Sequence, residues 1–489
     1  MSGLNEFSIP SLVTERPVAR GVLADPSITT WAVWGLGRSG VAVANLLAGR
    51  GYDVIASDTR TRAQLAESLS KLDPDVRVHT EANVVGGAQA IVLSPGMPPT
   101  APAIVAARAR GLPMLSEIEI AWCAARAPMI CITGTDGKTT TTSLIGAILE
   151  RDGREVVVAG NIGTPLCEVV EDVSSNGLIV AEVSAFQLWS VRDFAPHIAC
   201  LTNLADDHLD YFGGDMEAYV AAKKRMIERM QGADAWFWID GHDVRGRLWA
   251  EGFGGRVGYF GLGEEAIDGG ERAVGASGGA MWSRGVGESD EPTARIRDTS
   301  RLGLHGPHNL KNMACAAGMA RCLGVSWEVI ARALEVFEGL PHRFERCGEL
   351  GTIDFIDDSK ATNAHAALAG LRGLDPRSYV AIVGGVDKGL DLSLLATHLA
   401  KTCCAVVCIG EMAQRIAAAI TGEYSEMPIE HAASMEQAVR AAVGAARRYH
   451  ARHVVLSPAA SSFDMFDSYA HRGQVFQQCV HALSMEQGS

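Results

Sequence analysis

PMICITGTDGKTTTTSLIGAILERDG, residues 128–153, reads as an apolar strand, a glycine turn and a helix. The common triphosphate-binding loop has the pattern G-x-x-x-x-G-K-[ST], which would place its first glycine where this chain has Ile132. The glycine is instead Gly134, so the loop is shortened. A turn with a lysine and threonines at a helix start still suits ATP, with Lys138 supplying charge and Thr139 facing Mg²⁺. The residues expected at the triphosphate are Gly134, Thr135, Asp136, Gly137, Lys138, Thr139 and Thr140.

The same order of strand, glycine turn and helix returns at residues 29–51 and 379–400. Strands that alternate with helices predict parallel sheets buried between helices. We therefore predict an α/β protein of three domains: an N-terminal Rossmann-like domain (1–126), a central P-loop ATPase-like domain with a parallel or mixed sheet (127–340), and a C-terminal Rossmann-like domain (341–489). The glycine-rich residues 263–292 lack periodicity, and we expect a surface loop or irregular hairpins there.

The composition excludes several partners. A formal net charge of −14 makes nucleic acid and anionic membranes poor partners for the whole surface. Eleven scattered cysteines without a paired C-x-x-C framework indicate buried thiols in a reducing compartment. No apolar run reaches about 18 residues, and the N-terminus lacks the apolar region of a signal peptide. We expect a soluble, cytoplasmic monomer without a membrane span.

A second glycine signature, GLGRSG at residues 35–40, follows the apolar strand WAVW, and Asp58 comes after the next strand. In a dinucleotide-binding turn, glycines approach a diphosphate and an acid binds ribose hydroxyls. The signature indicates NAD or another nucleotide diphosphate, and a turn that merely needs glycine is the alternative. The segment LSPGMPP at residues 93–99 is expected to close over the same crevice.

Three features of the central region suggest a metal-assisted phosphate reaction. Glu182 interrupts an apolar strand, where a bare carboxylate is costly to bury. The stretch LTNLADDHLD ends another strand with Asp206, Asp207 and His208, for which a solvated acidic turn is the alternative. On the helix at residues 215–230, Lys223 falls within the apolar stripe. A snorkelling lysine is the common explanation, but beside a metal site an inward lysine with a task is favoured.

These motifs resemble the Mur ligases of bacterial cell-wall synthesis. The shortened loop G-T-x-G-K-[ST] is shared by that family and the folylpolyglutamate synthetases. Further matching stretches are AGNIGTP (159–165), EVSAFQL (182–188), TNLADDHLDYF (202–212), GPHNLKN (306–312), LPHRFE (340–345), DDSKATN (357–363) and LSPAASSFDMF (456–466). They span essentially the full chain. DDSKATN and SPAASSFD resemble the branch of the family that adds D-glutamate.

The resemblance implies an ATP-dependent ligase that converts the carboxylate of UDP-N-acetylmuramoyl-L-alanine to an acyl-phosphate, which the amine of D-glutamate then attacks. It implies two Mg²⁺ ions. The metal ligands implied are Thr139, Glu182, His208 and a carbamylated Lys223, and the catalytic residues are Lys138, Glu182, His208, Lys223 and Arg343. Further contacts with ATP are expected from Asn309, Asn312, Arg343, Asp358 and Lys360.

The resemblance also implies two further substrate sites. D-Glutamate is expected at Thr362, Lys388, Ser462 and Tyr469, and the last departs from the phenylalanine typical of relatives. The UDP-substrate is expected at Gly37, Arg38, Ser39, Asp58, Thr59, Arg60, Ser94, Gly96, Asn161, Ser184 and His208. Asp136 is a second departure, because asparagine is commoner there. An acid at that position repels triphosphate unless it binds metal or faces away.

Three rival functions differ in what they require. A folylpolyglutamate synthetase would lack an N-terminal domain such as residues 29–110 form here. An NAD(P)-dependent oxidoreductase with an accessory ATPase would bind its cofactor at Asp58. A nucleotide-dependent scaffold without catalysis would leave Glu182, His208 and Lys223 without a common purpose.

Overall fold

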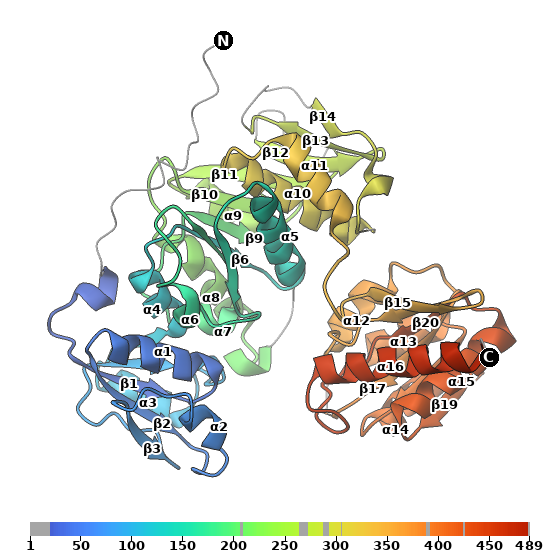
Figure 1. The fold of residues 1–489 in the computed structure, drawn as a ribbon, viewed down its shortest axis with the longest axis horizontal. Coiled ribbons are helices and arrows are strands. Elements are labelled where there is room, and N and C mark those ends of the chain that lie inside the picture. Colours follow the sequence, from blue (N-terminus) through green and yellow to red (C-terminus); the bar gives the residue numbers. More distant parts are fainter. Residues whose placement is uncertain are drawn as a thin grey trace. The chain divides into compact units, whose positions relative to one another are not determined.

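The computed structural model describes residues 20–205, 209–263, 272–286, 293–304, 306–387, 392–423 and 426–487. The chain divides into two compact units, Met1–Phe337 and Glu338–Ser489 (Figure 1). Sheets alternate with helices in both units, which confirms the α/β class. The division into three domains stays a prediction, because both sides of the boundary expected after residue 126 lie in the first unit.

The N-terminal sheet has five parallel strands in the order β3-β2-β1-β4-β5. Their bounds are β1 Thr30–Trp34, β2 Asp53–Asp58, β3 Arg77–Thr80, β4 Ala90–Leu93 and β5 Met114–Ser116. The chain moves from β1 to one edge at β3, and β4 and β5 lie on the other side of β1. Ligands bind such sheets at the carboxyl ends of strands where the order reverses. The loops after β1 and β4 meet that condition.

The central sheet has nine strands in the order β14-β13-β12-β11-β10-β9-β6-β8-β7. Their bounds are β6 Met129–Thr133, β7 Val156–Gly160, β8 Leu178–Glu182, β9 Ile198–Leu201, β10 Trp236–Asp240, β11 Arg256–Leu262, β12 Ala273–Ser277, β13 Ala280–Arg284 and β14 Thr293–Ile296. The β12–β13 and β13–β14 pairs are antiparallel and the other pairs are parallel, so the sheet is mixed. The order reverses around β6, whose loop is the shortened phosphate loop.

Helices cover both faces of the central sheet. The helices of the first unit are α1 Arg38–Gly49, α2 Ala66–Leu69, α3 Pro102–Ala109, α4 Glu117–Ala124, α5 Lys138–Arg151, α6 Leu166–Val169, α7 Ala185–Leu188, α8 Met216–Glu228, α9 Val244–Glu251, α10 Pro307–Cys322 and α11 Trp327–Val336, with short 3₁₀ turns at Gly21–Ala24, Leu209–Phe212 and Thr299–Arg301. α5, α10 and α11 share one hydrophobic core on one face (Figure 1). α6, α7 and α8 contribute to a second core on the other face.

The glycine-rich stretch forms part of the central sheet. Gly278 and Gly279 join β12 to β13 with φ angles of +56° and +78°, the left-handed conformations that a two-residue hairpin turn requires. Of the two alternatives predicted here, a surface loop or irregular hairpins, the structure has a hairpin. Its strands β12 and β13 pair regularly within the nine-stranded sheet, which was not predicted. Glycine and alanine in these strands give no alternating pattern to detect. Residues 264–271 and 287–292 lie outside the described residues.

The second unit contains a six-stranded sheet in the order β15-β16-β20-β17-β18-β19, with only the β15–β16 pair antiparallel. The strands are β15 Glu345–Leu350, β16 Ile353–Asp357, β17 Tyr379–Gly384, β18 Ala405–Ile409, β19 Ile429–Ala432 and β20 His453–Leu456. The helices are α12 Ala364–Leu371, α13 Ser393–Thr402, α14 Ala413–Glu423, α15 Met435–Tyr449 and α16 Tyr469–Gln487. The last strand, β20, lies between β16 and β17, so the loops after these three strands meet at one edge.

Two buried glutamates on α4 tie the N-terminal sheet to the central one. Glu117 accepts a hydrogen bond of 2.6 Å from the backbone N–H of Cys167 in α6. Glu119 accepts hydrogen bonds from the three backbone N–H groups of residues 192–194 at 2.9–3.1 Å. A single hydrophobic core contains strands of both sheets. α4 therefore joins the two sheets by polar and by apolar contacts.

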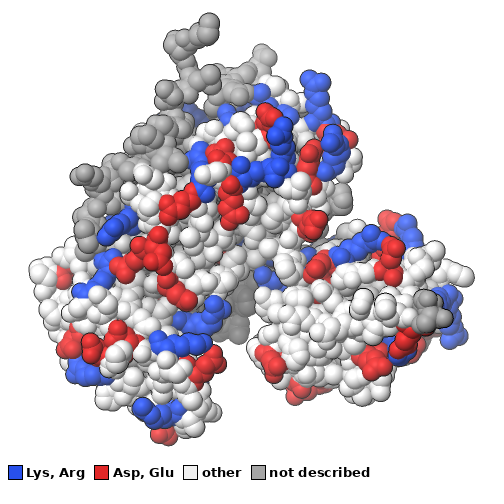
Figure 2. Space-filling view, in the orientation of Figure 1, with Lys and Arg blue, Asp and Glu red and all other residues white. Residues whose placement is uncertain are grey.

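Figure 2 shows Lys and Arg scattered among Asp and Glu on one face, without one extended basic field. All eleven cysteines are free thiols, and none of them is exposed. Within the described ranges, no helix combines the length and apolarity needed to cross a bilayer.

The burial of Glu117 predicts a pH-dependent stability. Burial raises its pKa from 4.5 to about 7, although N–H groups at the start of α6 oppose the rise. The folded state then holds the proton more tightly than the unfolded state, so this contribution is full below the unfolded pKa and is lost as pH rises through about 7. The Glu117→Gln variant cannot ionise at this position. We therefore expect the free energy of unfolding of the variant to lack this pH-dependent contribution of about 3 kcal/mol.

Urea unfolding near pH 5 and near pH 8 measures the effect. Glu168→Gln is the matched control, because Glu168 is an exposed residue of α6 beside Cys167. A wild-type free energy of unfolding that differs from that of Glu117→Gln by the same amount at both pH values would contradict the prediction.

Candidate functional site

The shortened loop is held against the end of β9 by hydrogen bonds. Gly134 has φ +144°, and a Cβ there would collide with Thr202 Oγ1. The Thr202 hydroxyl donates to the Asp136 carbonyl at 2.5 Å. The Asn203 side-chain carbonyl accepts from the N–H groups of Thr135 and Asp136 at 3.2 and 2.9 Å. The loop backbone is therefore fixed before α5 begins.

Positive charge gathers at this loop. Lys138 Nζ donates to the carbonyls of Gly134 and Thr135 at 3.0 and 2.7 Å. Gly137, with φ +77°, precedes α5 as its N-cap, and Thr139 and Thr140 are buried in its first turn. The dipole of α5 adds a partial positive charge at the same end. Together these groups form a site for an anion of high charge.

Lys223 of α8 points inward, as the helical period predicts. Its side chain is 2 % exposed, whereas Lys224 and Arg225 are exposed. Its Nζ donates to the Gly134 carbonyl at 2.6 Å and lies 4.7 Å from the centroid of the Tyr219 ring. Two lysines from different helices therefore bind one carbonyl of the phosphate loop.

Glu182 ends β8 beside the strand that carries the loop. It pairs in register with Ile132 of β6, and its side chain is 2 % exposed. Oε1 accepts from Asn161 Nδ2 at 2.8 Å, while no hydrogen bond to Oε2 is present among the described residues. A buried carboxylate oxygen without a partner is costly and suits a cation. The donor set of Glu182 with Thr139 fits Mg²⁺, which prefers oxygen ligands.

The start of α10 closes the other side of the loop. Asn312 is buried, and its Oδ1 would lie 2.5 Å from a Cβ placed on Gly137. Thr141 Oγ1 lies 3.4 Å from the same oxygen, and Asn312 Nδ2 lies 3.5 Å from Asn309 Oδ1. Asn312 thus lies next to the loop, and Asn309 lies beside Asn312. The contact of both with the adenine stays a prediction.

In the N-terminal sheet, Asp58 holds the glycine turn rather than standing open to a ligand. One oxygen accepts from the Leu36 N–H at 2.7 Å, and both accept from the Arg60 guanidinium at 2.8–3.0 Å. Burial acts to raise the pKa of Asp58, but these hydrogen bonds outweigh it and lower the pKa to about 2. A Cβ on Gly40 would collide with the Gly35 carbonyl, so glycine is required where α1 packs on the turn. Thr59 and Arg38 are exposed at this edge and Ser39 is half-buried.

The loop after β4 lies beside the glycine turn, as predicted. A Cβ on Gly35 would lie 2.6 Å from Ser94 Cβ. The Tyr211 hydroxyl, from the central region, donates to the Met97 carbonyl at 2.6 Å. The loop with Ser94 and Gly96 therefore bridges the N-terminal crevice and the segment that follows β9. Ser184 caps α7 after β8 through a capping box with Gln187.

In the second unit, the motif at residues 357–363 meets the segment at residues 457–462. Asp358 Oδ2 accepts from Ser457 Oγ at 2.8 Å. Burial raises the pKa of Asp358 to about 7, against Ser457 and Arg343, which lower it. Thr362 and Ser461 line one small hollow. Lys360 Nζ lies 5.8 Å from the centroid of the Tyr469 ring.

The sequence did not single out two polar residues at this edge. Arg472 is fully buried and donates to Ser359 Oγ and to the Ser359 carbonyl at 2.9 and 2.8 Å. Ser461 and the predicted Ser462 have buried hydroxyls without a hydrogen-bond partner in the part of the chain that is described. No local pattern distinguishes Arg472 from a surface arginine, because its burial depends on residues more than a hundred positions away.

Several predicted residues lie outside the described residues or in the other unit. His208, with Asp206 and Asp207, and Lys388 belong to segments outside the description. Arg343, Asp358 and Lys360 belong to the second unit, whereas the phosphate loop belongs to the first. Their predicted roles at ATP and D-glutamate stay predictions.

Models of known protein families match three consecutive segments of this chain. Residues 29–116 match the Mur ligase MurD-like N-terminal domain, residues 132–320 the Mur ligase middle domain and residues 342–460 the Mur ligase glutamate ligase domain. The UDP-N-acetylmuramoylalanine–D-glutamate ligase of Chlorobaculum parvum is 37% identical over 93% of this chain and 97% of its own. That of Acidobacterium capsulatum is 38% identical over 92% and 95%.

Solved structures share the fold. The UDP-N-acetylmuramate-alanine ligase MurC of Thermotoga maritima has a TM-score of 0.54 at 17% identity, over 93% of this chain and 100% of its own. The folylpolyglutamate synthase of Mycobacterium tuberculosis, solved with ADP and AMPPCP, has a TM-score of 0.55 at 14% identity, over 72% and 92%. Because relatives at 37–38% identity span 92–93% of the chain and the three domain types follow one another along it, the protein belongs to the Mur ligase family.

Proposed function

We propose that this protein joins D-glutamate to UDP-N-acetylmuramoyl-L-alanine at the expense of ATP, in peptidoglycan precursor synthesis. The observation that carries the proposal is the arrangement around Gly134, where Lys138 and Lys223 meet the phosphate loop. Beside it, Glu182 has a buried oxygen without a hydrogen-bond partner among the residues that the structure describes. The curated relatives named above as D-glutamate ligases support the choice of substrates. The match of residues 29–116 supports a UDP-substrate domain, which the folylpolyglutamate rival lacks.

The reaction forms an amide from a carboxylate, which is a poor acyl donor. A carboxylate oxygen of the substrate attacks the γ-phosphorus of ATP, so the P–O bond to ADP breaks and an acyl-phosphate forms. The amine of D-glutamate attacks the acyl carbon, phosphate leaves, and the amine loses a proton. The protein contributes placement and charge neutralisation more than covalent chemistry.

We assign one role to each of the central residues. Backbone N–H groups of the loop and Lys138 bind the β- and γ-phosphates, and Asn309 and Asn312 bind the adenine side. Thr139, Glu182 and a carbamylated Lys223 would hold Mg²⁺, with His208 at a second ion. When bound, Mg²⁺ would supply positive charge against the phosphates. Carbamylation would turn the inward amine of Lys223 into an anionic oxygen ligand.

Two further sites complete the proposal. The glycine turn with Arg38 and Ser39, the Ser94 loop and Asn161 bind the UDP-substrate, and Asp58 orders that turn through Leu36 and Arg60. In the second unit, D-glutamate binds at residues Thr362, Lys388, Ser462 and Tyr469. Arg343, Asp358 and Lys360 act at the γ-phosphate and ribose. We propose that the enzyme works as a cytoplasmic monomer, which light scattering tests.

The function is tested by phosphate release from ATP with Mg²⁺ and UDP-N-acetylmuramoyl-L-alanine. We expect release when D-glutamate is added, and background release with L-glutamate or without an amino acid. Release that depends on another amino acid would contradict the D-glutamate proposal and leave the assignment to the Mur ligase family unchanged. Release that needs no nucleotide sugar would contradict the role of the N-terminal sheet.

Lys223→Ala should lower kcat by at least about 100-fold, because it removes a charged group at the transferring phosphoryl group. Added short carboxylic acids should restore part of the activity if the natural ligand is a carbamate. Lys224→Ala, an exposed neighbour on the same helix, is the control and should keep wild-type kcat. Full activity of Lys223→Ala would remove the lysine from the mechanism.

Ser462→Ala should raise the KM for D-glutamate by about 10-fold, because a hydrogen bond to a charged carboxylate contributes about 1.5 kcal/mol or more. The KM for ATP should stay within about 2-fold. Ser484→Ala on α16, whose hydroxyl donates to the Val480 carbonyl, is the control. An unchanged KM for D-glutamate would show that the buried hydroxyl of Ser462 does not touch the amino acid.

A further inference from the structure

The loop before β15 adopts an unusual backbone on both sides of Arg343. His342 has φ +62° and Phe344 has φ +51°, although neither is glycine. A left-handed conformation costs a residue with a side chain about 1–2 kcal/mol. Such conformations persist where the surroundings determine them, and they cluster at functional sites. The contacts made by the residues around this loop therefore indicate which side chain the loop positions.

Two consecutive aspartates hold the two residues that flank Arg343. At the end of β16, Asp357 Oδ2 lies 2.7 Å from His342 Nδ1, and both side chains are buried. The next residue, Asp358, accepts from the Phe344 N–H through Oδ1 at 3.2 Å. The His342 carbonyl accepts from the Lys360 N–H at 2.9 Å. Arg343 is thus carried between two anchored residues.

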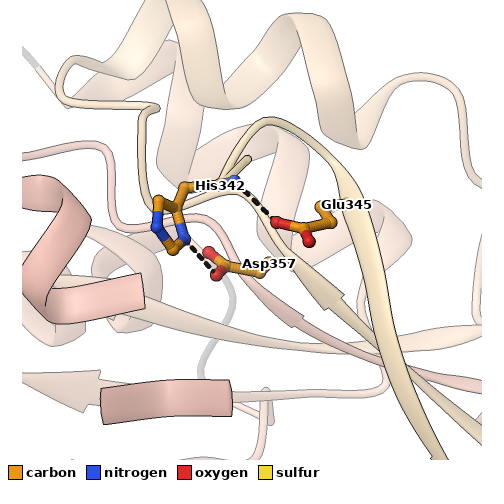
Figure 3. A group of neighbouring side chains, drawn as sticks. All are labelled: His342, Glu345 and Asp357. Atoms are coloured by element: carbon orange, nitrogen blue, oxygen red, sulfur yellow. Dashed lines mark hydrogen bonds and ion pairs between the residues drawn. The ribbon is translucent and has the colours of Figure 1, made fainter. Parts of the chain in front are cut away.

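A second layer from α16 locks the His342–Asp357 pair. Gln477 Nε2 donates to Asp357 Oδ2 at 2.9 Å and to Glu345 Oε2 at 3.1 Å. Glu345 Oε2 also accepts from the His342 N–H at 2.7 Å, and Figure 3 shows His342 joined by dashed lines to both Glu345 and Asp357. A Cβ on Gly473 would collide with His342 Nδ1. α16 can approach the pair because residue 473 is glycine.

This group of side chains is a hydrogen-bonded network and not a metal site. Ligand atoms of His342, Glu345 and Asp357 come within 4.8 Å of one another, as a metal site would require. However, the amide N–H groups of Gln477 point at both carboxylates and would repel a cation. Asp357 Oδ1 accepts from the Ser359 N–H at 2.9 Å. Both oxygens of Asp357 and Oε2 of Glu345 are therefore engaged by groups within the protein.

Arg343 is half-buried. Its positive charge acts on the buried carboxyl of Asp358, whose pKa it lowers. We propose that His342, Asp357, Gln477 and Gly473 are positioning residues that preset Arg343 for the transferring phosphoryl group. The inference rests on the role of Arg343 proposed above. A preset cation lowers the reorganisation needed in the transition state, and a misplacement near 1 Å is enough to cost about 100-fold in rate.

Two variants test the network from α16, each with a matched control. Gln477→Ala removes the shared donor, and Gln478→Ala changes the exposed neighbour on the same helix. Gly473→Ala pushes on His342, and Gly444→Ala in α15 adds a Cβ that meets nothing within 4 Å. We expect both network variants to lower kcat by about 10- to 100-fold at nearly constant KM for D-glutamate. Both controls should keep wild-type kcat.

The same variants in an Arg343→Ala background separate positioning from general damage. If the network acts through Arg343, Gln477→Ala and Gly473→Ala should add less than about 2-fold to the loss caused by Arg343→Ala. Losses that multiply in full would overturn the inference, as would wild-type kcat in the folded single variants. Melting curves identify which variants are folded. A wild-type kcat for Arg343→Ala itself would instead refute the proposed role of Arg343.

Discussion

The close approach of the loop at residues 134–137 to the end of β9 is the constraint on which the central site depends. Thr202 lies where a side chain of Gly134 would be, and its hydroxyl binds the loop backbone. This contact sets the direction of the N–H groups that open α5. Lys138 and Lys223 then donate to carbonyls of the same loop. A backbone fixed in this way needs little rearrangement when phosphate binds, which is the condition for electrostatic catalysis.

The three sheets place their functional loops by the same rule. In the first two sheets the order of strands reverses at one point, and in the third β20 returns to lie between β16 and β17. In all three, loops at the carboxyl ends of neighbouring strands carry the motifs. The turn at residues 35–40, the loop at residues 134–137 and the segments at residues 357–363 and 457–462 all occupy such positions. Strand order thus brings together motifs that lie up to a hundred residues apart in the sequence.

Local patterns predicted the features that local physics decides. The fold class followed from repeated strand, glycine turn and helix, and the inward side of Lys223 followed from the 3.6-residue period. Glu182 was identifiable because burying a carboxylate in an apolar strand costs free energy unless a partner binds it. The network around His342 was not predictable, because Asp357 and Gln477 come from distant elements and glutamine on a helix is ordinary. Glu117 was missed for a related reason, since a helix rich in isoleucine and glutamate reads as amphipathic until its neighbours are known.

The joint made by α4 limits how this protein can be recombined with its relatives. Ile118 and Ile120 of α4 belong to the same hydrophobic core as Leu166 of α6 and Leu188 of α7. Glu117 and Glu119 additionally bind backbone groups beside those two helices. A chimera that exchanged the N-terminal sheet alone would leave isoleucines and carboxylates facing a foreign surface. A crossover that carries α4 together with the α6 and α7 segments keeps both sides of the joint from one parent.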